Sequence, residues 1–271
     1  MTKALLALTT LQLQLCCHAA PIAPPNQLPI LDNPITNAED IRAALKQAAV
    51  IPDVLPDFLP THALTLTYPK SDSGSNPAVT LGNILSPSEA SDSPAYFIKP
   101  LTPPASLSPT LTIPSNVTYT LVLSDPDATS HANPTKGEMC HWILTGIKLV
   151  SVNATNAIDT DGYQIRFSES EPELEPEPKS ESSLEKRTVI LPSELISYMP
   201  PGPPPKTGYH RYVFVLLAPV EGEEPPKELS KPKERAHWGY GEKGRGVRNW
   251  AGDNGLVPVG ANFFYAQNEE Q

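Results

Sequence analysis

The stretch that decides the fold is Tyr119-Thr120-Leu121-Val122-Leu123-Ser124-Asp125-Pro126-Asp127-Ala128. Its first half is an apolar run of strand length and its second half is an acidic turn. Two other apolar runs, 142–144 and 212–217, begin one and two residues after a histidine, His141 and His210. Strand ends that carry acids and imidazoles can hold polar groups around one small cavity. The sequence therefore predicts a ligand pocket that contains Asp125, Asp127, His141 and His210.

Around this stretch the chain shows many short alternating or apolar runs, separated by Pro, Gly and Ser turns. The runs predict strands at 64–68, 79–82, 95–98, 119–123, 142–152 and 212–217. One helix is expected from Ala38 to Ala49, capped by Asn37 and ended by the Ile51-Pro52 step. The predicted class is mostly β, an antiparallel β-sandwich with a few peripheral short helices.

The composition and the first residues restrict the function. A net charge of −10 argues against a nucleic-acid partner, because binding a polyanion needs a basic patch. Residues 1–20 combine Lys3, an apolar run and small residues at Ala19 and Ala20, the layout of a signal peptide; residues 21–36 form a proline-rich leader. No other apolar run reaches membrane-spanning length. We expect a secreted, monomeric product.

Cysteine use and local composition add three expectations. Removing the signal peptide, which contains Cys16 and Cys17, leaves Cys140 as the single cysteine, so no internal disulfide is expected. Adjacency on a strand argues against a dyad of Cys140 with His141. A buried structural thiol is predicted instead. The sequons at Asn153 and Asn116 are candidate glycosylation sites. Segments 168–187 and 221–236 are charged and poor in apolar residues, so they are predicted to be disordered insertions within one domain, 37–271.

Three motifs carry a family resemblance: Asp125-Pro126-Asp127-Ala128, then His141-Trp142, then Gly202-Pro203-Pro204 with Gly208-Tyr209-His210-Arg211-Tyr212. Together with the closing segment, Trp250-Ala251 and Asn262-Phe263-Phe264, the chain from 54 to 267 resembles the phosphatidylethanolamine-binding protein family. The resemblance implies a ligand site for a phospholipid head group or a small phosphate-bearing anion. Its residues would be Asp125, Pro126, Asp127, Glu138, His141, Tyr198, His210, Tyr212 and Phe264.

The chemistry of these residue types fits such a ligand. Histidine N–H groups would donate to a phosphate, while the aspartates orient the histidines or accept from an ammonium group. An Asp before Pro also serves simply to shape a turn, and both readings stay open for Asp125 and Asp127. Arg211 alternates with His210 and is expected on the other face, in a structural ion pair.

Three functions compete at this point: head-group binding without catalysis, inhibition of a peptidase of the serine carboxypeptidase type, and an Asp/His hydrolase. The chain has no H-x-x-x-H zinc pattern, no G-x-S-x-G elbow and no phosphate-binding glycine loop followed by lysine. We therefore predict no enzyme, no catalytic residue, no metal and no cofactor. The family resemblance favours head-group binding, with peptidase inhibition as the alternative.

Overall fold

The computed structural model describes residues 37–69, 74, 76–101, 117–149, 163–165, 192–222 and 228–271, with 163–165 as backbone alone. Within these ranges the strands form a four-stranded sheet, in the order β2 (Ala78–Val79), β1 (His62–Thr67), β4 (Ala95–Pro100) and β7 (Tyr163–Ile165). They also form a six-stranded sheet, in the order β3 (Asn83–Ile84), β10 (Leu256–Ala266), β9 (His210–Pro219), β5 (Thr118–Asp125), β6 (Met139–Lys148) and β8 (Ser193–Ile196). Strand pairs are antiparallel except β3 with β10. The predicted antiparallel sandwich is confirmed.

The helices are α1 (Ala38–Gln47), α2 (Val50–Asp53), the short 3-10 helix η1 (His237–Gly239) and α3 (Val247–Asp253). Helix α3 had not been predicted.

Helix α1 begins as the sequence predicts, because the Asn37 side chain accepts a hydrogen bond from the Asp40 backbone N–H (2.8 Å). The helix ends at Gln47, two residues earlier than expected, and the short segment α2 that follows is interrupted at the predicted stop, where Ile51 has non-helical backbone angles (φ −101°, ψ 116°). The cause is Pro52, because the ring of a proline disfavours the helical conformation of the residue before it.

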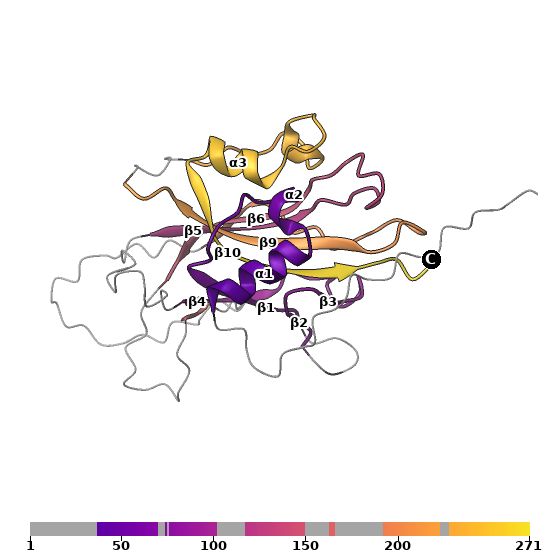
Figure 1. Cartoon of the computed structure of the whole chain (residues 1–271), viewed down its shortest axis with the longest axis horizontal. Coiled ribbons are helices and arrows are strands. Elements are labelled where there is room, and N and C mark those ends of the chain that lie inside the picture. Colours follow the sequence, from indigo (N-terminus) through magenta and orange to yellow (C-terminus); the bar gives the residue numbers. More distant parts are fainter. Residues whose placement is uncertain are drawn as a thin grey trace, which may run out of the picture.

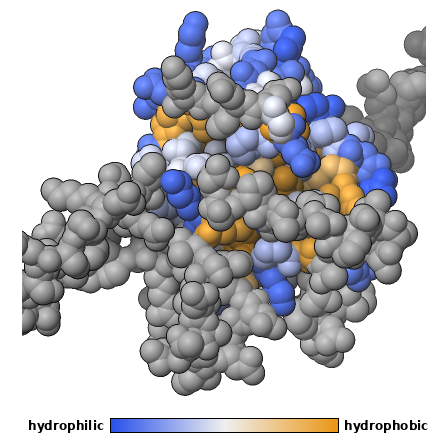
Figure 2. All heavy atoms as spheres, turned by 90° about the vertical axis from the view of Figure 1, so that its left-hand side faces the viewer, coloured by the Kyte–Doolittle hydropathy of each residue, from blue (hydrophilic) through white to orange (hydrophobic). Residues whose placement is uncertain are grey.

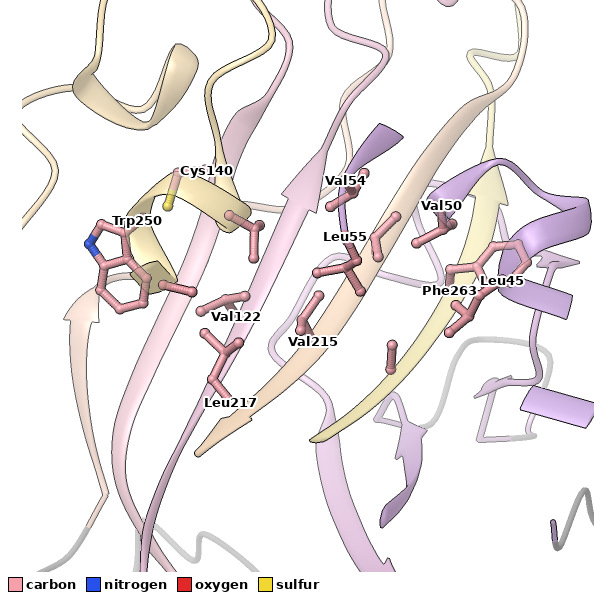
Figure 3. Close-up of a cluster of buried hydrophobic side chains, with 14 of the residues drawn as sticks. Leu45, Val50, Val54, Leu55, Val122, Cys140, Val215, Leu217, Trp250 and Phe263 are labelled. Atoms are coloured by element: carbon pink, nitrogen blue, oxygen red, sulfur yellow. The ribbon is translucent and has the colours of Figure 1, made fainter. Parts of the chain in front are cut away.

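The two faces of the six-stranded sheet are covered differently, as Figure 1 shows. Helices α1, α2 and α3 pack on one face, and their core includes Leu45, Val54 and Trp250 against the strands (Figure 3). The four-stranded sheet covers the other face. Strand β9 is buried on both sides: Val213, Val215 and Leu217 belong to the helix-side core, and Tyr212, Phe214 and Leu216 to the core between the sheets. This explains why its sequence is continuously apolar rather than alternating.

Segment 221–236, predicted to be disordered, is partly ordered. Residues 228–236 lie within the described ranges, where the Ser230 carbonyl accepts from the Trp250 indole N–H (2.9 Å) and Pro232 is buried. Composition concealed this because the contacts use mainly backbone groups and proline, with Leu229 as an apolar side chain that packs against the helix-side core. The signal peptide, the leader and segment 168–187 lie outside the described residues.

The described surface carries few large apolar side chains. Figure 2 shows hydrophilic residues gathered at the top of one face and hydrophobic residues lower down. Among the described residues, Ile84 and Val257 are the large hydrophobic side chains classed as exposed, at 38% and 39%. No helix in these ranges is both long enough and apolar enough to cross a membrane.

Candidate functional site

The three motif segments meet at one end of the six-stranded sheet. Strand β5 ends at Asp125, which pairs with Met139 at the start of β6, and β9 begins beside them at His210. Because β5 is antiparallel to both neighbours, the end of β5 lies beside the beginnings of β6 and β9. The sheet thus brings together side chains from positions 125, 141 and 210.

His141 owes its orientation to an irregularity in this pairing. Leu123 pairs with Trp142 and Ser124 with Cys140, so His141 is an extra residue on β6, as in a β-bulge. Its ring packs edge-on against Tyr212, with ring centroids 5.3 Å apart. Cys140 points the other way, into the helix-side core, where burial raises its thiol pKa to about 12. The predicted structural thiol is confirmed.

The hydrogen bond of His141 assigns its tautomer. Nδ1 lies 2.8 Å from the Met199 carbonyl, which can only accept, so Nδ1 carries the proton. Burial lowers the pKa of His141, an effect that the nearby Asp125 charge partly opposes. The ring is therefore neutral near pH 7, and Nε2, which has no hydrogen bond to a described residue, is an acceptor.

His210 and Asp125 form a buried pair in the same site. The Asp125 carboxylate lies 2.9 Å from His210 Nδ1, and its other oxygen accepts from the Asp127 backbone N–H. His210 Nε2 lies 3.0 Å from the Thr207 hydroxyl oxygen, and that hydroxyl donates to the Pro204 carbonyl (2.7 Å). Both ring nitrogens of His210 thus face partners within the protein, so donation to a ligand would require breaking one of these bonds.

Tyr212 supplies the unpartnered group of the site. Its ring stacks on Phe264 at a centroid distance of 5.3 Å and lies nearly parallel to the His210 ring. The side chain is fully buried, and its hydroxyl lies near the Gly202 backbone N–H and the Asp125 carboxylate without a well-aligned hydrogen bond to a described residue. Burial and then the Asp125 charge raise its pKa. A buried hydroxyl without a partner is costly, so a water or a ligand group is expected to bind it.

Asp127 lies away from these groups and has a structural role. Both of its oxygens accept from Arg211, at 2.8 and 2.9 Å, and one also pairs with His131. Burial alone would raise the pKa of Asp127, but the bonds from His131 and Arg211 hold it well below its usual range. Arg211 also bonds the Asp53 carboxylate on the helix side (2.9 Å). The predicted ion pair of Arg211 is confirmed, and it occupies the carboxylate that had been assigned to ligand binding.

Glu138 also lies on the helix side of the sheet. Its carboxylate accepts from the Ser124 hydroxyl (3.0 Å) and from the Val247 backbone N–H at the start of α3 (3.3 Å). Burial raises its pKa to about 7. Asp125 and Ser124 are adjacent on β5 and face opposite sides, so Glu138 is separated from Asp125 by the sheet.

The remaining predicted residues form the surroundings of the site. The Tyr198 hydroxyl donates to the Ala90 carbonyl (2.8 Å), and its ring packs edge-on against Trp142. Phe264 backs Tyr212 as an apolar wall, and Pro126 is buried in the turn. Asn116 and Asn153 lie outside the described residues. Among those residues, no group of three or more His, Cys, Asp or Glu side chains is arranged to hold a metal ion.

Sequence reasoning missed Thr207 and Met199. Thr207 stands three residues before His210 in a proline-rich turn, and that spacing was an available signal. Met199 acts through its backbone carbonyl, so its residue type contains no signal. The candidate ligand site, as the structure defines it, comprises Asp125, His141, His210 and Tyr212, with Thr207 and Met199 as supporting partners.

Comparison with known proteins places this arrangement in a family. A sequence model described as phosphatidylethanolamine-binding protein matches residues 75–264. The chain is 32% identical to the carboxypeptidase Y inhibitor of Saccharomyces cerevisiae over 229 residues, which cover 83% of this chain and 93% of the relative.

Two solved structures are also similar. The crystal structure of carboxypeptidase Y inhibitor complexed with the cognate proteinase matches with a TM-score of 0.66 and 28% identity, covering 87% of this chain and 98% of that one. A phosphatidylethanolamine-binding protein from Plasmodium vivax matches with a TM-score of 0.54 at 20% identity, covering 84% of this chain and 97% of the other, and supports the fold alone. With a family model that matches more than half of its length, this chain belongs to the phosphatidylethanolamine-binding protein family.

Proposed function

We propose that this protein is a peptidase inhibitor directed at carboxypeptidases of the serine class and has no catalytic activity of its own. The observation that carries the proposal is the similarity to carboxypeptidase Y inhibitor, which extends over 93% of that relative's sequence and 98% of the chain in its complex with the proteinase. Peptidase inhibition, the alternative in the sequence reading, thereby becomes the main proposal.

The hydrolase alternative has one geometric argument in its favour. The His210 ring contacts Asp125 through Nδ1 (2.9 Å) and Thr207 through Nε2 (3.0 Å). This is the order of groups in a Ser-His-Asp triad. A nucleophile must donate its proton to the imidazole, however, whereas Thr207 donates to Pro204. The amides on either side, Lys206 and Gly208, already bond the C-terminal segment, so neither is free to bind an oxyanion. We therefore assign these residues a structural role.

The inhibitor proposal is tested with the full-length protein. Increasing amounts are added to a fixed concentration of carboxypeptidase Y, and hydrolysis of a blocked dipeptide is followed. We expect activity to fall in proportion to the added protein until an equimolar amount is present. Carboxypeptidase A, a zinc enzyme, is the control and should keep its activity. Full carboxypeptidase Y activity at a large excess of folded protein would contradict the proposal.

A second function, binding of a phosphate-bearing head group, is supported by the Tyr212 hydroxyl, which can donate to a phosphate, and by His141 Nε2, which as an acceptor can take a hydrogen bond from the ammonium group rather than donate to the phosphate as the sequence had predicted. Calorimetric titration of phosphoethanolamine into wild type and His141→Ala tests it, and affinity should fall about tenfold for one hydrogen bond of roughly 1.4 kcal/mol. Because His141 has a lowered pKa, any strengthening of binding by its protonation is expected below the ordinary imidazole range. Equal affinities would exclude His141 from the site.

The same variant separates the two functions. His141→Ala should bind phosphoethanolamine more weakly, yet inhibit carboxypeptidase Y as wild type does, if inhibition uses another surface.

Secretion belongs to the same proposal and rests on the layout of residues 1–20. Intact-mass analysis of protein from the culture medium should show loss of these residues, and a mass that includes them would contradict it.

A further inference from the structure

Residues 197–209 connect β8 to β9 and carry Met199 and Thr207 to the candidate ligand site. Five residues of this segment are prolines, which have no backbone N–H to donate: Pro200, Pro201, Pro203, Pro204 and Pro205. Ladder hydrogen bonds cannot hold such a segment, so its position depends on a few tertiary contacts.

Arg235 makes the densest set of these contacts at the start of the segment. One guanidinium nitrogen donates to the Cys140 and His141 carbonyls, both at 3.1 Å. The other donates to the Ser197 carbonyl (3.0 Å) and to its hydroxyl oxygen (3.2 Å). The Arg235 carbonyl also accepts from the Cys140 backbone N–H (2.8 Å). One side chain therefore joins the beginning of β6 to the end of β8.

These contacts converge on His141. Met199 exchanges two hydrogen bonds with it: the Met199 N–H donates to the His141 carbonyl (2.9 Å), and the Met199 carbonyl accepts from Nδ1. Arg235 donates to the same His141 carbonyl and also to Ser197, which lies two positions before Met199. A planar guanidinium suits this place because its donors have fixed directions, whereas lysine offers one mobile ammonium group.

We propose that Arg235 is a positioning residue of the candidate ligand site. It holds residues 197–199 against β6, so that the Met199 carbonyl keeps the His141 proton on Nδ1 and leaves Nε2 as an acceptor beside Tyr212. The effect on ligand affinity rests on the head-group function proposed above, but the effect on the His141 ring does not.

The test compares Arg235→Ala and Arg235→Lys with wild type and with Arg245→Ala. Arg245 is the matched control because it lies in the same C-terminal segment and pairs with Glu242. Long-range proton–nitrogen spectra of the uniformly labelled, ligand-free protein report which ring nitrogen of His141 is protonated, and the His141→Ala spectrum assigns the signals. Phosphoethanolamine affinity is measured on the same samples.

We expect the Nδ1–H tautomer alone in wild type and in Arg245→Ala, and both tautomers in Arg235→Ala. Affinity should fall by about tenfold or more, comparable with the 10–100-fold loss when the group that orients a metal-bound histidine is removed. Arg235→Lys should be intermediate, and it serves as the test if the alanine variant does not fold. An unchanged tautomer in a folded Arg235→Ala, or wild-type behaviour of Arg235→Lys in both measurements, would overturn the proposal. A changed tautomer without any phosphoethanolamine binding by wild type would reject the head-group function and keep the role of Arg235.

Discussion

Replacing Glu138 with glutamine should make the protein more stable at alkaline pH. The Glu138 carboxylate is 5% exposed and joins β6 to α3 through Ser124 and the Val247 N–H. A glutamine carbonyl can accept both bonds without bringing a charge into the core. Arg248 and Arg211 favour the charged form of Glu138, but burial outweighs them and its pKa rises from 4.5 to about 7.

The size and direction of the effect follow from that pKa. Between pH 4.5 and 7 the folded chain keeps a proton that the unfolded chain has lost, so stability falls as pH rises through this interval. A pKa difference of one changes the unfolding free energy by about 1.4 kcal/mol, so the rise from 4.5 to about 7 corresponds to about 3 kcal/mol of lost stability. Glu138→Gln should lack this loss. For a domain of this size, about 3 kcal/mol corresponds to roughly 6–12 °C in melting temperature.

The assay is urea unfolding of wild type and Glu138→Gln at several pH values from 4.5 to 8. The quantity of interest is the difference in unfolding free energy between the two proteins, because other groups that titrate in both cancel. Between pH 4.5 and 7 the variant should gain about 3 kcal/mol of stability relative to wild type, and above that range the difference should stay constant. Glu242→Gln, which removes an exposed carboxylate, is the control. A difference that stays constant with pH would refute the reasoning.

Three further predictions concern stability and are checked by chemical denaturation. Arg211→Met should lower the unfolding free energy by about 3–5 kcal/mol, because it leaves the buried Asp127 carboxylate without its main partner. Leu217→Ala should cost about 2–5 kcal/mol, since this fully buried side chain lies in the helix-side core. Gly246→Ala should cost about 1–3 kcal/mol, because the added Cβ would lie 2.1 Å from the hydrogen-bonded Glu138 carboxylate.

Each of these substitutions has a control at a more exposed or less crowded position. Arg245→Met removes a half-exposed arginine, Ile84→Ala a side chain that is 38% exposed, and Gly252→Ala adds a methyl group with nothing within 4 Å. All three should change stability by less than about 0.5 kcal/mol. Losses equal to those of the buried partners would show that burial and contact are not the cause.

The sequence was sufficient for the strands and for much of the site. Strands β1, β4, β5 and β9 were recognisable because apolar residues recur with a period of two or in short runs, which is a local property of the chain. Because side chains alternate along a strand, the sequence also predicted that Arg211 points to the face of the sheet opposite to His210, as observed. Three motifs at strand ends then sufficed for the family and for the grouping of positions 125, 141 and 210.

The partners of the charged residues could not be read in this way. Asp127 and Glu138 stood in the ligand motifs, yet one carboxylate binds Arg211 and the other the Val247 N–H, 84 and 109 positions further along the chain. Partners so far apart are chosen by sheet register and by the turn after β5, which the local pattern does not contain. Helix α3 was missed for a related reason: its seven residues cover fewer than two full periods of an apolar pattern.

By itself, the sequence of this protein determined a mostly β sandwich of the phosphatidylethanolamine-binding protein family and the residue types at one end of its sheet. The tertiary structure alone decided which face each side chain occupies and which atoms remain free. The extra residue in β6 turns His141 toward Tyr212. The Met199 backbone carbonyl determines which ring nitrogen of His141 carries the proton, and the His141 backbone carbonyl helps to hold Arg235. Every residue has such a carbonyl, so only the packed chain shows which ones meet a donor.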